Sequence, residues 1–391
     1  MRRKRTLLLS LFAFCLIAGT ATAQRYLITD LGPLTPIAIN SWAQIVGNYN
    51  NRAYIWTLGR MRSLGTLPGG TFSRAGGIND LGVVVGTADG QGTVAVLPDN
   101  MFGYVGPNQD CSNLIQPFIW KQQMQGLGTV APASDVEYTY TFWDTSVWCD
   151  NAFYGSGINN RGQVIGYTEY LGDIFQWGIL WTPSEGMSLL GWGWETFPNQ
   201  ISNTGQIVGE SGEGFQTATS WKDGVATSLG GLPGNFLSSV ASGVNDQGQV
   251  VGWSINVTED YSDRHVRAVM WTREGMIREL GTLSGDTESI AKKINMFGIV
   301  IGDSGTDYIP EPPITGYGPT IEGPVEVVGR PFIWSERTGM RNLNTLIPQN
   351  SGWVLQSATD INVWGQIVGQ GTRNGQPHGY LLTPLNPFQV F

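Results

Sequence analysis

The segment Ile158-Asn159-Asn160-Arg161-Gly162-Gln163-Val164-Ile165-Gly166 contains the pattern that decides the fold. An apolar residue and an Asn lead into a short turn, and an apolar strand that ends in Gly follows. An Asn side chain can bond a backbone amide inside such a turn, and a Gly there can adopt the left-handed conformation that the turn needs. The segment therefore predicts a tight β-hairpin.

This phrase recurs seven times along the chain, at residues 38–47, 78–86, 158–166, 201–209, 244–252, 294–302 and 361–369. The fourth copy has Ser202 where the others have Asn. A residue that recurs at one place in a repeat is typical of a structural role rather than of a catalytic one. We therefore assign a role in the turns to Asn40, Asn79, Asn159, Asn245, Asn295 and Asn362.

Two more phrases recur with the first. One ends in Trp in six copies, at Trp56, Trp120, Trp181, Trp221, Trp271 and Trp334, and its last copy ends at Leu382. The other resembles Leu-Gly-Thr-Leu and begins at Leu31, Leu64, Leu127, Leu190, Leu229, Leu280 and Leu343. A large aromatic residue at one place in every unit is expected to pack in the core.

The three phrases divide each unit of about 50 residues into four short strands, which is typical of a β-propeller blade. We predict that the first ends at Ile-Asn, the second is Gln-Val-Val-Gly, the third ends at Trp and the fourth ends at Leu-Gly-x-Leu. Residues 26–32 form an extra fourth strand at the start, and the last unit lacks its own. The sequence thus predicts an all-β, seven-bladed β-propeller with four-stranded blades, closed by pairing of the N-terminal strand with the last blade. A ring of six or eight blades and a β-solenoid are the alternatives.

The triple phrase resembles the HAF repeat, which is expected in extracellular bacterial proteins. The resemblance covers almost all of residues 26–383. It departs from the family pattern at the first letter, because His378 alone keeps the His and Ala or Pro replaces it in several copies. The resemblance implies secretion and a repeat architecture. It implies no catalytic residues.

Composition excludes several classes of protein. The chain has 391 residues, of which 54 are Gly, about twice the usual share. Charged residues make up only 14%, which is too few for a typical disordered chain or coiled coil, and 41% of residues are hydrophobic. We predict that one propeller domain spans residues 24–391.

The first 23 residues resemble a secretory signal peptide. A basic start (residues 2–5) precedes an apolar stretch that is short for a membrane span, and Ala21-Thr22-Ala23 is a cleavage site of small residues. We expect cleavage after Ala23 and a secreted, extracellular or periplasmic monomer without a membrane span. The net charge of −9 becomes more negative without the basic start, which disfavours nucleic acid and membrane surfaces as partners.

Two cysteines, Cys111 and Cys149, remain after this cleavage. A disulfide between them is the first expectation in an oxidising compartment. Two free thiols and, less favoured, a metal site are the alternatives. We predict no obligatory cofactor. Asp260, Asp263 and Asp303 are candidate oxygen ligands for calcium, although no EF-hand spacing is present.

Long insertions at residues 89–116, 131–152, 254–266 and 305–329 all follow second or fourth strands, so they should emerge on one face of the ring. Such a face is usually the binding face of a repeat protein. Its exposed aromatic and acidic residues suit a neutral polysaccharide or a peptide. The predicted ligand-binding residues are Tyr138, Tyr140, Trp143, Asp144, Trp148, Trp192 and Trp194. The alternative is that these aromatic side chains only pack the loops onto the ring.

The sequence favours a non-enzymatic binding or interaction scaffold for an extracellular polysaccharide or an envelope partner. It contains no Gly-x-Ser-x-Gly elbow, His-Glu-x-x-His helix or phosphate loop, and we assign no catalytic residue. The alternative function is a carbohydrate-active hydrolase or lyase with paired carboxylates in the propeller funnel.

Overall fold

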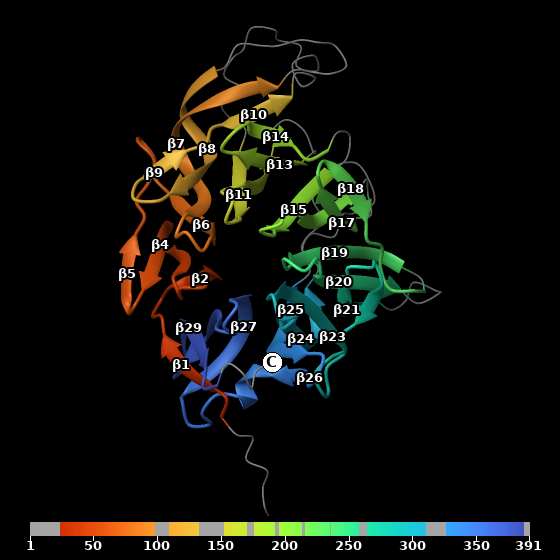
Figure 1. Cartoon of the computed structure of the whole chain (residues 1–391). Helices are drawn as coiled ribbons and strands as arrows, with labels where there is room; N and C mark the ends of the chain where they lie inside the picture. Colours follow the sequence, from red (N-terminus) through yellow and green to blue (C-terminus); the bar gives the residue numbers. More distant parts are fainter. Residues whose placement is uncertain are drawn as a thin grey trace, which may run out of the picture.

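Seven antiparallel blades follow one another around a ring in the computed structural model (Figure 1). The chain is almost entirely β-strand in its described part, apart from one 3-10 turn, η2 (Leu343–Thr345). This confirms the predicted all-β, seven-bladed propeller with four-stranded blades. The structure describes residues 24–97, 109–132, 152–169, 176–191, 195–212, 216–234, 236–257, 264–309 and 326–386.

The strands of each blade follow the order of the chain. Blade 1 contains β2 (Thr35–Ile39), β3 (Ile45–Tyr49), β4 (Arg52–Thr57) and β5 (Arg60–Ser63). Blade 2 contains β6 (Ser73–Ile78), β7 (Val84–Leu97), β8 (Gln109–Trp120) and β9 (Met124–Gly126), with β10 (Thr129–Pro132) beside β7. Blade 3 contains β11 (Ala152–Ile158), β12 (Val164–Glu169), β13 (Gln176–Thr182) and β14 (Gly186–Leu189).

Blades 4 to 7 repeat this order. Blade 4 contains β15 (Glu195–Ile201), β16 (Ile207–Gly212), β17 (Thr217–Lys222) and β18 (Val225–Ser228). Blade 5 contains β19 (Phe236–Val244), β20 (Val250–Val257), β21 (Arg264–Trp271) and β22 (Ile277–Glu279). Blade 6 contains β23 (Glu288–Ile294), β24 (Val300–Ile309), β25 (Glu326–Ser335) and β26 (Gly339–Asn342). Blade 7 contains β27 (Trp353–Ile361), β28 (Ile367–Arg373), β29 (Gln376–Pro384) and β1 (Tyr26–Asp30).

The N-terminal strand closes the ring. β1 pairs antiparallel with β29, from Tyr26 opposite Pro384 to Asp30 opposite Tyr380, as the sequence predicted. Asp30 fastens the end of this strand, because its carboxylate accepts hydrogen bonds from Arg373 Nη1 (2.6 Å) and the Gly32 amide (2.8 Å). His378 Nδ1 lies 2.8 Å from the same carboxylate. His378, the one residue that keeps the His of the repeat pattern, therefore helps to close the ring.

The recurring Asn side chains form a belt of hydrogen bonds around the ring, which we call the turn belt (Asn40, Asn79, Asn159, Asn245, Asn295 and Asn362). Within its own turn, the Asn159 carboxamide oxygen accepts bonds from the amides of Arg161 and Gln163, each at 3.0 Å. Its Nδ2 donates to the Ser202 carbonyl in the next blade (3.0 Å), and Asn362 Nδ2 likewise reaches Asn40 (3.0 Å). The structural role predicted for these residues is confirmed.

The turn Gly adopts the left-handed conformation that the sequence predicted. Gly162, for example, has φ +76°. In blade 1, Ala43 takes this place with φ 57°, a conformation that costs a residue with a side chain about 1 kcal/mol.

Two predicted details need correction. The fourth strand of blade 1 ends at Ser63, so Leu-Gly-x-Leu follows the strand instead of ending it, and Leu64 and Leu67 are buried between blades. In the last copy of this phrase, η2 replaces extended chain. The phrase-ending Trp side chains are buried in four blades, at Trp120, Trp221, Trp271 and Trp334. Trp56 and Trp181 are only partly buried, so the expected core role holds for them only in part.

Candidate functional site

The ligand-binding residues predicted from the sequence lie outside the described residues. They are Tyr138, Tyr140, Trp143, Asp144, Trp148, Trp192 and Trp194. The same holds for Cys149, Asp260 and Asp263, and of Cys111 only the backbone in β8 is described. The predicted disulfide and the loop platform therefore remain predictions. The strands that lead into these loops do bound a cavity.

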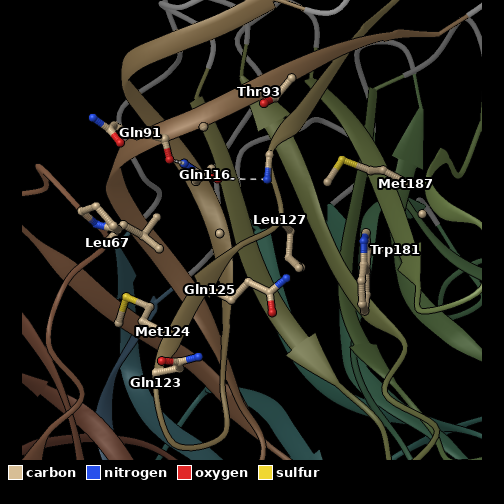
Figure 2. A pocket seen from close by; sticks show the side chains of 15 residues that line it. Leu67, Gln91, Thr93, Gln116, Gln123, Met124, Gln125, Leu127, Trp181 and Met187 are labelled. Atoms are coloured by element: carbon tan, nitrogen blue, oxygen red, sulfur yellow. Dashed lines mark hydrogen bonds between the residues drawn. The ribbon is translucent and has the colours of Figure 1, made fainter.

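This cavity is a cleft of about 710 Å³ between blades 2 and 3, which we call the amide cleft (Figure 2). Its walls come from β7, β8 and the chain around β9 on one side and from β13 and β14 on the other. No charged side chain is among its lining residues in the described chain. The lining includes Gln91, Gln116, Gln123, Gln125, Trp181 and Met187.

Gln116 fixes the geometry of the cleft wall. Its side chain is fully buried, and its Nε2 donates to the Gln91 carbonyl (2.8 Å) while its Oε1 accepts from the Gly128 amide (2.9 Å). A Cβ atom at Gly92 or at Gly126 would come within about 2.3 Å of this carboxamide. The two glycines therefore make room for Gln116, which joins the long β7–β8 hairpin to the chain that enters β10.

The open part of the cleft carries free amide groups opposite an indole. Gln125 on β9 and Trp181 on β13 lie on opposite sides of the cleft, with Met187 above Trp181 (Figure 2). Gln123 and Gln125 are exposed, whereas Trp181 is half-buried. A carboxamide both donates and accepts hydrogen bonds, and an indole offers a flat apolar face. This combination suits a ligand that is polar, uncharged and partly flat.

The amide cleft lies at the base of two predicted insertions. β7 and β8 continue the second and third strands of blade 2 outward to residues 97 and 109, and β10 ends at Pro132. β10 pairs parallel with the outer part of β7, from Thr129 opposite Val94 onward. Part of the insertions at 89–116 and 131–152 is therefore regular strand, which the sequence did not predict.

A second group with unusual chemistry is a carboxylate pair in blade 4, Glu195 and Glu210. Glu195 lies opposite Gly212 and Glu210 opposite Phe197 in the β15–β16 ladder, so the two residues are diagonal neighbours. Gln216 Nε2 donates to Glu195 Oε2 (3.3 Å). Burial, together with repulsion from Glu195, raises the pKa of Glu210 to about 8, and burial also raises the pKa of Glu195.

Blade 6 has the same two acidic positions but neutralises them. Glu288 corresponds to Glu195, and its carboxylate lies 3.4 Å from Arg267 Nη1. Asp303 corresponds to Glu210 and pairs with Lys292. Burial raises the pKa of Asp303, and Lys292 opposes this shift. In the described part of blade 4, Asn199 stands where Lys292 would be, so the carboxylate pair has no such cation.

Asp303, named above as a possible calcium ligand, is therefore engaged in an ion pair. Within the described residues, no group of three or more His, Cys, Asp and Glu side chains is arranged to hold a metal ion. No helix there is long and apolar enough to cross a membrane.

Sequence reasoning missed both sites for identifiable reasons. The glutamines of the amide cleft stand outside the repeated phrases and come together only because two blades meet. The carboxylate pair had a signal, since Glu210 directly follows the Gly of the repeated Gly-Gln-Ile-Val-Gly and Glu195 opens the same unit. Comparing that place between repeats would have found it.

Comparisons with known proteins add a likeness of fold. No protein-family model and no curated protein matches the chain. Among solved structures, the chain is similar to an oligogalacturonate lyase in complex with manganese, with 10% identity and a TM-score of 0.46 over 94% of this chain and 98% of that one. It is also similar to a puromycin-hydrolysing peptidase from Mycobacterium tuberculosis, with 11% identity and a TM-score of 0.45 over 91% of this chain and 50% of that one.

A third similar structure is dipeptidyl peptidase 4 from Porphyromonas gingivalis, with 9% identity and a TM-score of 0.38 over 69% of this chain and 43% of that one. The chain thus spans half or less of the length of the two peptidases. At these identities, the likeness concerns the arrangement of strands and carries no argument about activity.

Proposed function

We propose that the protein is an exported, non-enzymatic binding propeller whose amide cleft holds a neutral polysaccharide. The observation that carries this proposal is the uncharged lining of the cleft, in which the exposed side chain of Gln125 lies across from Trp181 (Figure 2) and Gln123 adds a second exposed carboxamide. Sugar hydroxyls both donate and accept hydrogen bonds, as carboxamides do, and the apolar face of a sugar ring can stack on an indole. A cleft of about 710 Å³ is within the range of small-ligand sites.

A charged ligand fits the amide cleft less well. Moving an ion out of water is costly unless an opposite charge compensates it. The lining residues offer no such charge. The cleft therefore selects for uncharged polar ligands, and its wide opening suits a segment of a chain better than an enclosed small molecule.

The insertion loops would extend the same site. The chain lines the cleft up to Gly128, runs outward through β10 to Pro132, and then enters the predicted loop with Tyr138, Trp143 and Trp148. We propose that these aromatic residues provide further stacking surfaces for the polysaccharide. Replacing Trp143 and Trp148 together by Ala should then remove or weaken the array signals described next.

A glycan array with the mature chain tests the proposal. We expect signals from neutral polysaccharides or oligosaccharides, and we expect Gln125→Ala and Trp181→Ala each to weaken them by about tenfold or more. Trp56→Ala is the matched control, because Trp56 holds the same place in blade 1 and does not line the cleft. The absence of any neutral-glycan signal would refute the proposal, as would an equal loss in the Trp56 variant.

The carboxylate pair supports a second candidate function, a carbohydrate-active hydrolase or lyase. With a pKa of about 8, Glu210 keeps its proton at neutral pH and can serve as an acid, while Glu195 is the neighbouring carboxyl group. Release of reducing ends or unsaturated products from polysaccharides by the mature chain would favour this function. Glu210→Gln should then abolish the release, and residual activity in that variant would exclude Glu210 as the acid.

Export is part of the proposal. The support is the basic and apolar start of the chain and the small residues before Gln24. The mass of the protein recovered from outside the cytoplasm should correspond to a chain that begins at Gln24.

A further inference from the structure

One face of the ring carries the tight turns and lies opposite the face where the long insertions are predicted. This tight-turn face has an unexpected row of exposed apolar side chains. They occupy one place, two residues after the turn-belt Asn of each blade. In four consecutive blades (6, 7, 1 and 2), this place holds Phe297, Trp364, Trp42 and Leu81, each more than half exposed. In blades 3 to 5 it holds Arg161, Thr204 and Gln247. We call the first four residues the apolar arc.

The two tryptophans of the apolar arc are held in place by their neighbours. Trp364 Nε1 donates to the Ser41 carbonyl in the next blade (2.9 Å), and Trp42 Nε1 donates to the Asp80 carbonyl in the blade after that (2.9 Å). Each indole therefore spans two blades while its ring stays exposed, at 55% for Trp364 and 72% for Trp42. These bonds orient both rings before any ligand arrives, which lowers the entropic cost of stacking.

A groove of about 770 Å³ lies beside Trp42 and Leu81, between blades 1 and 2. Its lining includes three exposed cations, Arg60, Arg62 and Lys121. No carboxylate of the described residues forms an ion pair with them, and the Arg62 guanidinium lies 4.7 Å from the centre of the Trp120 ring.

The acidic residue that lines this groove is already engaged. The Asp80 carboxylate accepts bonds from the Ser41 amide (2.8 Å) and Asn160 Nδ2 (3.1 Å). Burial tends to raise its pKa, but these bonds outweigh burial and hold the pKa below the usual value. Its charge is thus directed into the turns, and the groove keeps an excess of positive charge in a chain whose net charge is −9.

We propose that the apolar arc and this groove bind an acidic polysaccharide, at a site separate from the amide cleft. The cations match carboxylate or sulfate groups, and the fixed indole faces match the flat apolar faces of sugar rings. An exposed apolar side chain recurs at one place in four consecutive blades, which suits a ligand that also repeats its unit. Because the protein as a whole is acidic, a polyanion is attracted only where cations dominate locally.

Dextran and carboxymethyl dextran share the same sugar rings but differ in charge, so comparing them distinguishes the two contributions to binding. Binding of the mature chain is measured by titration calorimetry with carboxymethyl dextran, unmodified dextran and poly-glutamate. We expect carboxymethyl dextran to bind at least about tenfold more tightly than the other two, and to bind more weakly as salt rises. Equal or tighter binding of poly-glutamate would overturn the proposal in favour of an acidic protein partner, and no binding of carboxymethyl dextran would overturn it outright.

Variants of exposed residues locate the site without endangering the fold. Combined Trp42→Ala and Trp364→Ala should weaken binding of carboxymethyl dextran by about tenfold or more. Combined Arg60→Gln, Arg62→Gln and Lys121→Gln should remove the preference over dextran.

The matched controls are Thr204→Ala and Lys222→Gln, which hold the corresponding places in blade 4 and should change nothing. Gln125→Ala, in the amide cleft, should also leave this binding intact. If the controls weaken binding as much as the groove variants, the site lies elsewhere on the ring.

Discussion

The turn belt and the place just after the Gly of each Gln-Val-Val-Gly strand behave in opposite ways. The turn belt has Asn in six of seven blades and makes the same bonds in each. The post-glycine position, as we call the other place, holds seven different residues: Asn48, Thr87, Tyr167, Glu210, Trp253, Asp303 and Gln370. The same fold thus keeps one side chain at the turn in six blades and tolerates many different ones at the post-glycine position.

The post-glycine position varies because its side chain meets the innermost strand of the next blade. Asn48 Oδ1 accepts from the Ala75 amide (2.8 Å), and Thr87 Oγ1 accepts from the Gly155 amide (3.1 Å). Tyr167 instead stacks edge-on with Phe197, next to Pro198, which has no amide hydrogen to satisfy. Neighbouring blades therefore determine what each copy needs. The comparison suggests four substitutions, taken from the largest expected effect to the smallest.

Asp303→Asn should destabilise the protein most. The change leaves Lys292, whose side chain is 26% exposed, without its counter-ion at Asp303, whose side chain is only 3% exposed. Breaking such a pair costs about 3 kcal/mol. Chemical denaturation measures the loss, and a double variant with Lys292→Met should recover part of it. A loss below about 1 kcal/mol in the single variant would show that the pair is well solvated.

Asn159→Ala should cost about 2 kcal/mol, since it removes bonds in its own turn and to the next blade. Ser202→Ala is the matched change in the one blade that lacks the Asn. Ser202 Oγ accepts a single amide bond from Gln206 (3.1 Å), so its loss should be smaller. Equal losses in thermal unfolding would contradict the role that we assign to the turn belt.

Glu210→Gln, at the same repeat position as Asp303, should stabilise the protein by about 1 kcal/mol at neutral pH. Burial and Glu195 raise the folded pKa of Glu210 to about 8, above its usual value of 4.5, so the folded state holds this proton more tightly than the unfolded state does. The contribution of this group to the free energy of unfolding is therefore at its maximum below about pH 4.5, and it declines as pH rises toward 8. The variant should show a flatter profile of melting temperature between these values, and an unchanged slope would refute the shift.

Ala43→Gly should have the smallest effect, a gain of about 0.5 kcal/mol. It relieves the left-handed conformation at φ 57° and gives up some packing of the Ala43 methyl group in return. Gly162→Ala, the reverse change in blade 3, should destabilise because that residue has φ +76°. Melting temperatures that move in the same direction for both would contradict this account of the turns.

The repeated positions made the fold predictable, and the unrepeated ones kept the sites hidden. The hairpin turns, the blade count and the pairing of the first strand with the last blade all follow from phrases that recur. The amide cleft depends on Gln125 and Trp181 meeting across two blades, which no local pattern encodes. The apolar arc was visible in the sequence as Trp42 and Trp364 in the turns, but their exposure depends on the blade geometry.

One measurement tests the proposed function most directly. It is the affinity of the mature chain for a neutral glycan identified on the array, measured by titration calorimetry for wild type, Gln125→Ala and Trp56→Ala. Gln125 is exposed on a hairpin, so its replacement leaves the ring intact. We predict a loss of affinity of about tenfold for Gln125→Ala and no change for Trp56→Ala. Unchanged affinity in the Gln125 variant would show that the amide cleft is not the glycan site.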